Sequence, residues 1–264
     1  MTTNDIWGTE KLPRREMDMI YIVDTSGSMA GAKIGSVNTA IPQTQTELDE
    51  ISKNNADAEI KIGLLEFSSD AHWMHEGFID PKSFKWVDLK AGGMTSMGGA
   101  FAELNKKLSR SHGWMNAPQG MRAPVLILIS DGAPTDNWQH YLSELKKNSW
   151  FKAACKIAIA IGDDADKNVL AEFTGGMESV ITVQTLDQLK KMIKAVSLTS
   201  AMVNSNTAGA GATGAAASNG ANPLPDPAKE VVKAVAGGAA DDPTLNGVEI
   251  GSTPINNAAF DDWD

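Results

Sequence analysis

The sequence predicts an α/β fold, with a doubly wound, mostly parallel central sheet and helices on both faces of that sheet. Short apolar runs rich in β-forming residues alternate along residues 16–200 with stretches whose apolar side chains recur at helical spacing. The run PVLILIS at 124–130 is apolar at successive positions, as a central parallel strand buried on both faces requires. Strands and helices that alternate in this way pack as one sheet with right-handed crossovers.

Five apolar runs are expected to form the strands of this sheet. They are residues 17–23, 59–67, 124–130, 155–161 and 179–183. The segments AHWMH (71–75) and SFKWV (83–87) are weaker candidates, which together would form a hairpin at one edge.

The segments between the expected strands carry helical periodicity. After the first strand, Ile34, Val37 and Ile41 begin a row of apolar residues at helical spacing, and Met97 and Phe101 begin another. The expected helices cover residues 33–52, 97–108, 138–148, 166–174 and 186–198.

Charge and composition limit the classes of partner. The 264 residues include 33 acidic and 23 basic side chains, a net charge of −10, so a binder of nucleic acid or of an anionic membrane is not expected. The one cysteine, Cys155, lies in an apolar run and cannot form an internal disulfide, which favours a reducing compartment. No segment resembles a signal peptide or reaches the roughly 20 apolar residues that cross a bilayer. We therefore expect a soluble, cytoplasmic protein.

The chain is expected to divide into an N-terminal extension (1–15), one domain (16–200) and an Ala/Gly-rich linker with an acidic tail (201–264), largely disordered. In 201–222, twelve of the 22 residues are Ala or Gly, too little apolar bulk to offset the entropy of ordering. A short helix that begins near Asp226 would order only on a partner. At the end of the tail, Phe260 and Trp263 among aspartates form either a docking motif or part of a solubilising tail.

Three polar loops are expected to meet at one edge of the sheet. Asp24, Ser26 and Ser28 follow the first strand, Thr95 precedes the second helix, and Asp131 follows the central strand. In a doubly wound sheet, ligands bind beyond the carboxyl ends of the strands where the strand order reverses. Two carboxylates and three hydroxyls suit a hard cation. Mg²⁺ fits this donor set best, and Mn²⁺ or Ca²⁺ are alternatives.

The motifs DTSGSM, MTSMGGA and ISDGAPTD, in this order, resemble those of the von Willebrand factor A (vWA) family, and more narrowly its bacterial TerY-like group from tellurium-resistance operons. The resemblance covers about residues 15–200. It implies a metal-ion-dependent adhesion site in which Asp24, Ser26 and Ser28 coordinate the ion, while Thr95 and Asp131 join directly or through water. It also implies a protein partner that donates a carboxylate to the metal, and an association with a kinase and a phosphatase.

Other interpretations of these residues remain open. Asp24, Ser26 and Ser28 could cap a helix, and Asp136 is expected to cap the helix that follows it. Met94 would form an adaptable apolar rim for a partner.

An enzyme is the main alternative function, a haloacid-dehalogenase-like, Mg²⁺-dependent phosphatase with Asp24 as its nucleophile. Such enzymes need a second Asp as the general acid, at the position that Ser26 occupies here. We therefore expect a binding module and no enzyme.

Overall fold

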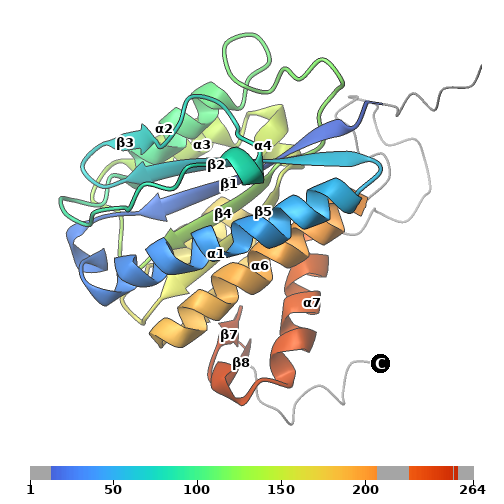
Figure 1. The fold of residues 1–264 in the computed structure, drawn as a ribbon. Coiled ribbons are helices and arrows are strands. Elements are labelled where there is room, and N and C mark those ends of the chain that lie inside the picture. The colour runs from blue at the N-terminus through green and yellow to red at the C-terminus, as the bar shows by residue number, and fades with distance from the viewer. Residues whose placement is uncertain (1–12, 207–225, 252, 255–264) are drawn as a thin grey trace, which may run out of the picture.

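The computed structural model describes residues 13–206, 226–251 and 253–254, which form a layered α/β fold around one sheet (Figure 1). The eight strands have the spatial order β3-β2-β1-β4-β5-β6-β7-β8. Neighbours from β2 to β6 run parallel, and the edge strands β3, β7 and β8 run antiparallel to theirs. The strands are β1 (Arg15–Asp24), β2 (Ala58–Phe67), β3 (Ala71–Trp73), β4 (Val125–Ser130), β5 (Cys155–Ile161), β6 (Val180–Val183), β7 (Glu249–Ile250) and β8 (Thr253–Pro254).

The five expected strands are confirmed, and the doubly wound, mostly parallel sheet is confirmed with them. The expected edge hairpin is only half correct. Residues 71–73 form β3, but residues 83–87 form no strand. Instead, Ile79 exchanges backbone hydrogen bonds with Ile62, at 2.7 and 2.9 Å, so the chain after β3 continues along the same edge of β2.

Seven helices in the described part of the chain cover the two faces of the sheet (Figure 1). Residues of α1, α6 and α7 share one apolar core with one face, and residues of α2, α3, α4 and α5 share a second core with the other. None of these helices is both long and apolar enough to cross a membrane. The helices are α1 (Ala32–Asn54), α2 (Met97–Lys107), α3 (Trp138–Leu145), α4 (Ser149–Ala153), α5 (Lys167–Thr174), α6 (Leu186–Asn206) and α7 (Pro227–Ala240).

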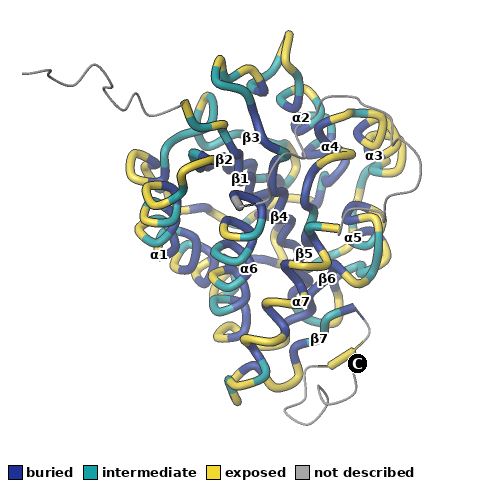
Figure 2. The backbone as a smooth tube through the Cα atoms, turned by 90° about the vertical axis from the view of Figure 1, so that its right-hand side faces the viewer, coloured by how far each residue is buried: buried dark blue, intermediate teal, exposed yellow. Residues whose placement is uncertain are grey.

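Two described parts of the expected tail, residues 201–206 and 226–251, differ from the disorder expected there. Helix α6 continues to Asn206, and α7 begins at Pro227 after Asp226, whose side chain accepts a hydrogen bond from the N–H of Ala228 at 3.0 Å. Val231 and Val235 of α7 are buried in the core that α1 and α6 share, and buried and exposed stretches alternate along α7 (Figure 2). The expectation that this helix orders only on a partner is therefore wrong, because its valine face finds an apolar surface within the same chain.

The strand β7 continues the sheet beyond α7 by pairing with β6. Residues 207–225 and 255–264, with Phe260 and Trp263, lie outside the described residues.

Candidate metal centre

The candidate centre lies at the carboxyl ends of β1 and β4, where the strand order reverses. From β1 the chain passes to β2 on one side, and later to β4 on the other. The loops after β1 and β4 therefore diverge from a shared crevice, the usual ligand site of such sheets. Val23 pairs with Ile129, so the next residues, Asp24 and Ser130, lie side by side on the same face of the sheet.

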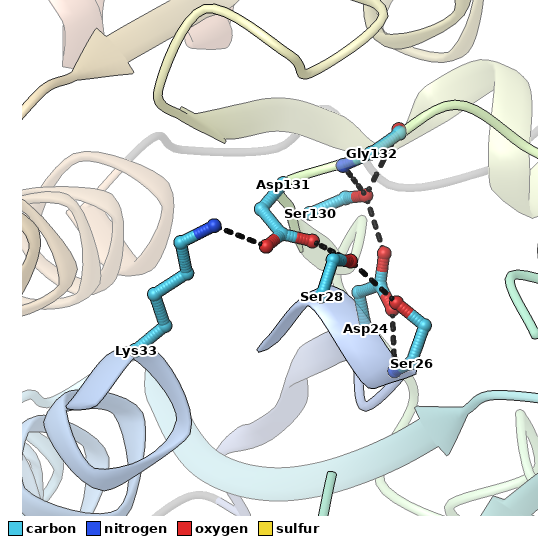
Figure 3. Close-up of polar contacts among 7 residues, drawn as sticks. All are labelled: Asp24, Ser26, Ser28, Lys33, Ser130, Asp131 and Gly132. Atoms are coloured by element: carbon cyan, nitrogen blue, oxygen red, sulfur yellow. Dashed lines mark hydrogen bonds and ion pairs between the residues drawn. The ribbon is translucent and has the colours of Figure 1, made fainter. Parts of the chain in front are cut away.

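Side-chain oxygens from the two loops form one hydrogen-bonded group (Figure 3). The hydroxyls of Ser26 and Ser28 lie 3.1 Å apart, and Ser28 donates to Oδ1 of Asp131 at 2.7 Å. Asp24 accepts from the Ser26 N–H at 2.8 Å and from the Ser130 hydroxyl at 2.6 Å. Four of the five expected site residues are thus linked in one series of hydrogen bonds, from Asp24 through Ser26 and Ser28 to Asp131.

The fifth expected residue, Thr95, is buried. Its loop is hydrogen-bonded to both the loop after β1 and the loop after β4. The N–H of Gly27 donates to the Gly93 carbonyl at 3.1 Å, and the Thr135 N–H donates to the Thr95 carbonyl at 2.9 Å. Gly93 has φ of +83°, and a Cβ there would lie 2.7 Å from Oγ of Ser69, so this close turn requires glycine. The three loops are therefore held together by backbone contacts that require no ligand.

Asp136 reinforces this arrangement in a way that differs from the prediction. Its carboxylate accepts hydrogen bonds from the Ser96 hydroxyl at 2.9 Å and from the N–H groups of Gly98 and Gly99, each at 3.1 Å. Asp136 thus caps α2, which precedes it by about 40 residues. The expectation that it caps the following helix is wrong, because Asn137 occupies the N-cap position of α3.

The charges of the site are partly compensated within the protein. Burial raises the pKa of the Asp24 carboxyl, and hydrogen bonds from Ser130 and Ser26 counteract part of that rise. Oδ2 of Asp131 lies 2.5 Å from the ammonium of Lys33, on the first turn of α1 (Figure 3). Sequence reasoning did not identify Lys33 or Ser130 as part of the site. Ser130 had a signal, because it ends a buried strand beside Asp24.

The donor set fits a hard divalent cation. In an octahedral shell with bonds of about 2.1 Å, adjacent oxygens lie about 3 Å apart. The oxygen separations at Ser26, Ser28 and Asp131, 3.1 and 2.7 Å, are close to this value. In the described part of the chain, no group of three or more His, Cys, Asp or Glu side chains is placed to hold a metal. A cation here would therefore depend on hydroxyl oxygens, and Ser28 is exposed to the solvent from which it would come.

Comparison with known proteins agrees with this fold. Residues 18–195 match the model of the von Willebrand factor type A domain. The chain belongs to this family. Domains of this family are known for metal-dependent protein–protein interaction and are typically interaction modules rather than enzymes. The resemblance to the vWA family is confirmed, and the narrower resemblance to the TerY-like group stays a prediction.

This chain spans less than half of the length of each of the following relatives. Inter alpha-trypsin inhibitor, heavy chain 4, from Mus musculus is 28% identical over 133 residues, which are 48% of this chain and 13% of that protein. A structure of proximal thread matrix protein 1 from the mussel byssus, with a zinc-occupied MIDAS motif, has a TM-score of 0.53 and 20% identity and covers 70% of this chain and 48% of its own. A von Willebrand factor type A structure from Catenulispora acidiphila has a TM-score of 0.51 and 14% identity, over 72% and 43%. At these identities the two structures show a common fold.

Proposed function

We propose that this vWA domain is a metal-dependent protein-interaction module. Asp24, Ser26, Ser28, Thr95 and Asp131 hold a divalent ion, with Mg²⁺ as the best fit and Mn²⁺ or Ca²⁺ as alternatives. The ion takes its remaining ligand from a carboxylate of a protein partner. The observation that carries this proposal is the series of hydrogen bonds from Asp24 through Ser26 and Ser28 to Asp131, at the switch point of the sheet.

The composition of the site favours capture of a carboxylate over catalysis. The two carboxylates among the five proposed ligands balance, but do not exceed, the charge of a divalent ion, so the loaded site would not repel a further anion. A phosphatase would need a general acid at the position of Ser26, whose hydroxyl instead lies 3.1 Å from that of Ser28. The family assignment gives the phosphatase alternative no support.

The surface beside the site offers apolar contacts to a partner. Met94, on the loop that carries Thr95, is 59% exposed, and Val87 is 60% exposed. Val87 lines a pocket of about 460 Å³ together with Thr25, the residue that follows Asp24 in the first site loop. We assign Met94 to the rim of the partner interface, because an exposed methionine adapts to varied apolar surfaces.

The cellular setting follows from the narrower resemblance. We place the protein as a cytoplasmic adaptor in a bacterial tellurium-resistance or stress-linked phosphorylation system, with a kinase and a phosphatase as candidate partners. The motifs of the TerY-like group support this setting. The single cysteine, Cys155, cannot form an internal disulfide, which fits a reducing compartment.

Affinity capture from native lysate tests the function directly. The chain is used as bait with Mg²⁺ or with chelator, and a partner whose capture needs Mg²⁺ supports the proposal. Thr95→Ala should weaken capture of that partner more than it weakens Mg²⁺ binding measured by calorimetry. Thr39→Ala is a matched control, because the Thr39 hydroxyl lies on α1 and donates to the Gly35 carbonyl of its own helix, at 2.8 Å. Capture that is identical with Mg²⁺ and with chelator would contradict the proposal.

A further inference from the structure

Lys33 contacts the candidate centre from outside the expected ligand set. Its ammonium lies 2.5 Å from Oδ2 of Asp131, whose side chain is fully buried, while the Lys33 side chain is 35% exposed. The other oxygen of the same carboxylate, Oδ1, accepts from Ser28. Asp131 therefore stands between the hydroxyls of the centre on one side and a lysine at the solvent boundary on the other (Figure 3).

The place of Lys33 in its helix is electrostatically unfavourable on local grounds. It is the second residue of α1, and the first turn of this helix contains no acidic residue. The N-terminus of a helix carries partial positive charge and favours anions over cations. The cation at this helix N-terminus is instead compensated by Asp131, which lies 98 positions away in the sequence. A locally unfavourable residue that is compensated by a distant one is typical of a functional position.

The charges of the site give Lys33 a defined effect. Asp24, Asp131 and Lys33 together carry a formal charge of −1, so a bound divalent cation would leave the site at +1. With a neutral residue in place of Lys33, the loaded site would have no net charge. Lys33 therefore opposes metal binding to the free protein and favours binding of one further anion to the loaded protein.

We propose that Lys33 is a second anchor for the partner's carboxylate and couples metal binding to partner binding. This inference rests on the proposed function. The long, partly exposed stem of Lys33 lets its ammonium turn from Asp131 toward a carboxylate at the metal. Because coupling between two ligands is reciprocal, the metal and the carboxylate each raise the affinity of the protein for the other.

Isothermal titration calorimetry on the full chain tests the proposal with two probes. Mg²⁺ is titrated with and without N-acetyl-aspartate N′-methylamide, a compound with one carboxylate. We expect Lys33→Met to raise the Mg²⁺ affinity about tenfold without the probe, and to weaken binding of the probe to the Mg²⁺-loaded protein about tenfold, as one unit of charge in largely aqueous surroundings would. Lys33→Arg keeps the charge and should behave much more like the wild type. Lys53→Met, at the other end of α1 and paired with Asp49, is the control and should change neither affinity.

The possible results separate this inference from the function on which it rests. Unchanged affinities in Lys33→Met, in a protein that binds Mg²⁺, would overturn the inference alone. A higher Mg²⁺ affinity with unchanged binding of the probe would overturn the role of Lys33 as an anchor. Absence of Mg²⁺ binding in both the wild type and Lys33→Met would overturn the proposed function and the inference together. Mg²⁺ binding that appears only in Lys33→Met would support the inference, and near-ultraviolet circular dichroism checks that the variant is folded.

Discussion

Asp24→Asn changes the charge of the candidate centre while preserving the shape of the side chain. In the structure, Asp24 accepts hydrogen bonds from the Ser26 N–H at 2.8 Å and from the Ser130 hydroxyl at 2.6 Å. The asparagine carbonyl can keep the first bond, and its amide can donate to the Ser130 oxygen. The fold should therefore survive, and the variant isolates the contribution of one buried negative charge.

The size of the effect should depend on the metal. Without metal, we expect the free energies of unfolding of Asp24→Asn and the wild type to agree within about 1 kcal/mol, because both hydrogen bonds are retained. At a Mg²⁺ concentration of about 100 times its Kd, the wild type gains about 2.7 kcal/mol. That gain corresponds to an increase in Tm of roughly 5–10 °C for a chain of this size. If the variant binds Mg²⁺ about 100-fold more weakly, it gains only about 0.4 kcal/mol under the same conditions.

Thermal unfolding followed by circular dichroism across a Mg²⁺ titration measures this difference. Asp49→Asn is a matched control, because Asp49 lies on α1 and pairs with Lys53, outside the site. An equal Mg²⁺-dependent rise in Tm for Asp24→Asn and the wild type would refute Asp24 as a ligand. If Asp49→Asn reduced the Mg²⁺-dependent rise in Tm as much as Asp24→Asn does, the effect would come from the general surface charge and not from the site.

Three further changes test other parts of the structure. Burial, and then the charge of Glu16, raise the pKa of Asp18 in the folded protein well above 3.8. The protonated Asp18 carboxyl therefore favours the folded state fully below pH 3.8, and this stabilisation is lost as the pH rises through the folded-state pKa. Urea unfolding should therefore show Asp18→Asn gaining stability relative to the wild type from pH 4 to pH 7, and a constant difference would contradict this. Asp136→Ala removes the cap of α2 and should lower the stability by about 1–2 kcal/mol, seen as a lower urea midpoint. Val231→Ala should cost about 2 kcal/mol, because the side chain is fully buried, whereas a helix outside the core would show no loss.

The central part of the fold was predictable because its sequence signals are local. Each parallel strand is a continuous apolar run, and β4 is buried at every position, which requires helices on both faces. The site loops were predictable for a related reason, since they directly follow β1 and β4 or precede α2. Once the order of strands and helices is known, the carboxyl edge of the sheet brings these loops together.

The features that sequence reasoning missed depend on contacts between distant residues. The valine face of α7 is a weak local signal, and the Ala/Gly-rich segment before it indicated that the folded part of the chain had ended. The strand β7 has only two residues, too few for any periodic pattern. Asp136 and Lys33 contact groups 37 to 98 positions away, while their local patterns indicate an ordinary cap and an ordinary surface lysine.

The contacts between the loops bear on why this site would bind a partner without a large rearrangement. The first two loops exchange backbone hydrogen bonds, from Gly92 to Thr25 at 2.8 Å and from Gly27 to Gly93 at 3.1 Å. The third loop joins them through the bond from Thr135 to Thr95. These backbone bonds need no ligand, and the oxygens of Ser26, Ser28 and Asp131 already lie close to the spacing of a metal shell. Little ordering entropy therefore remains to oppose binding. What then changes on loading is the charge of the site, so recognition would depend on whether the partner supplies a carboxylate.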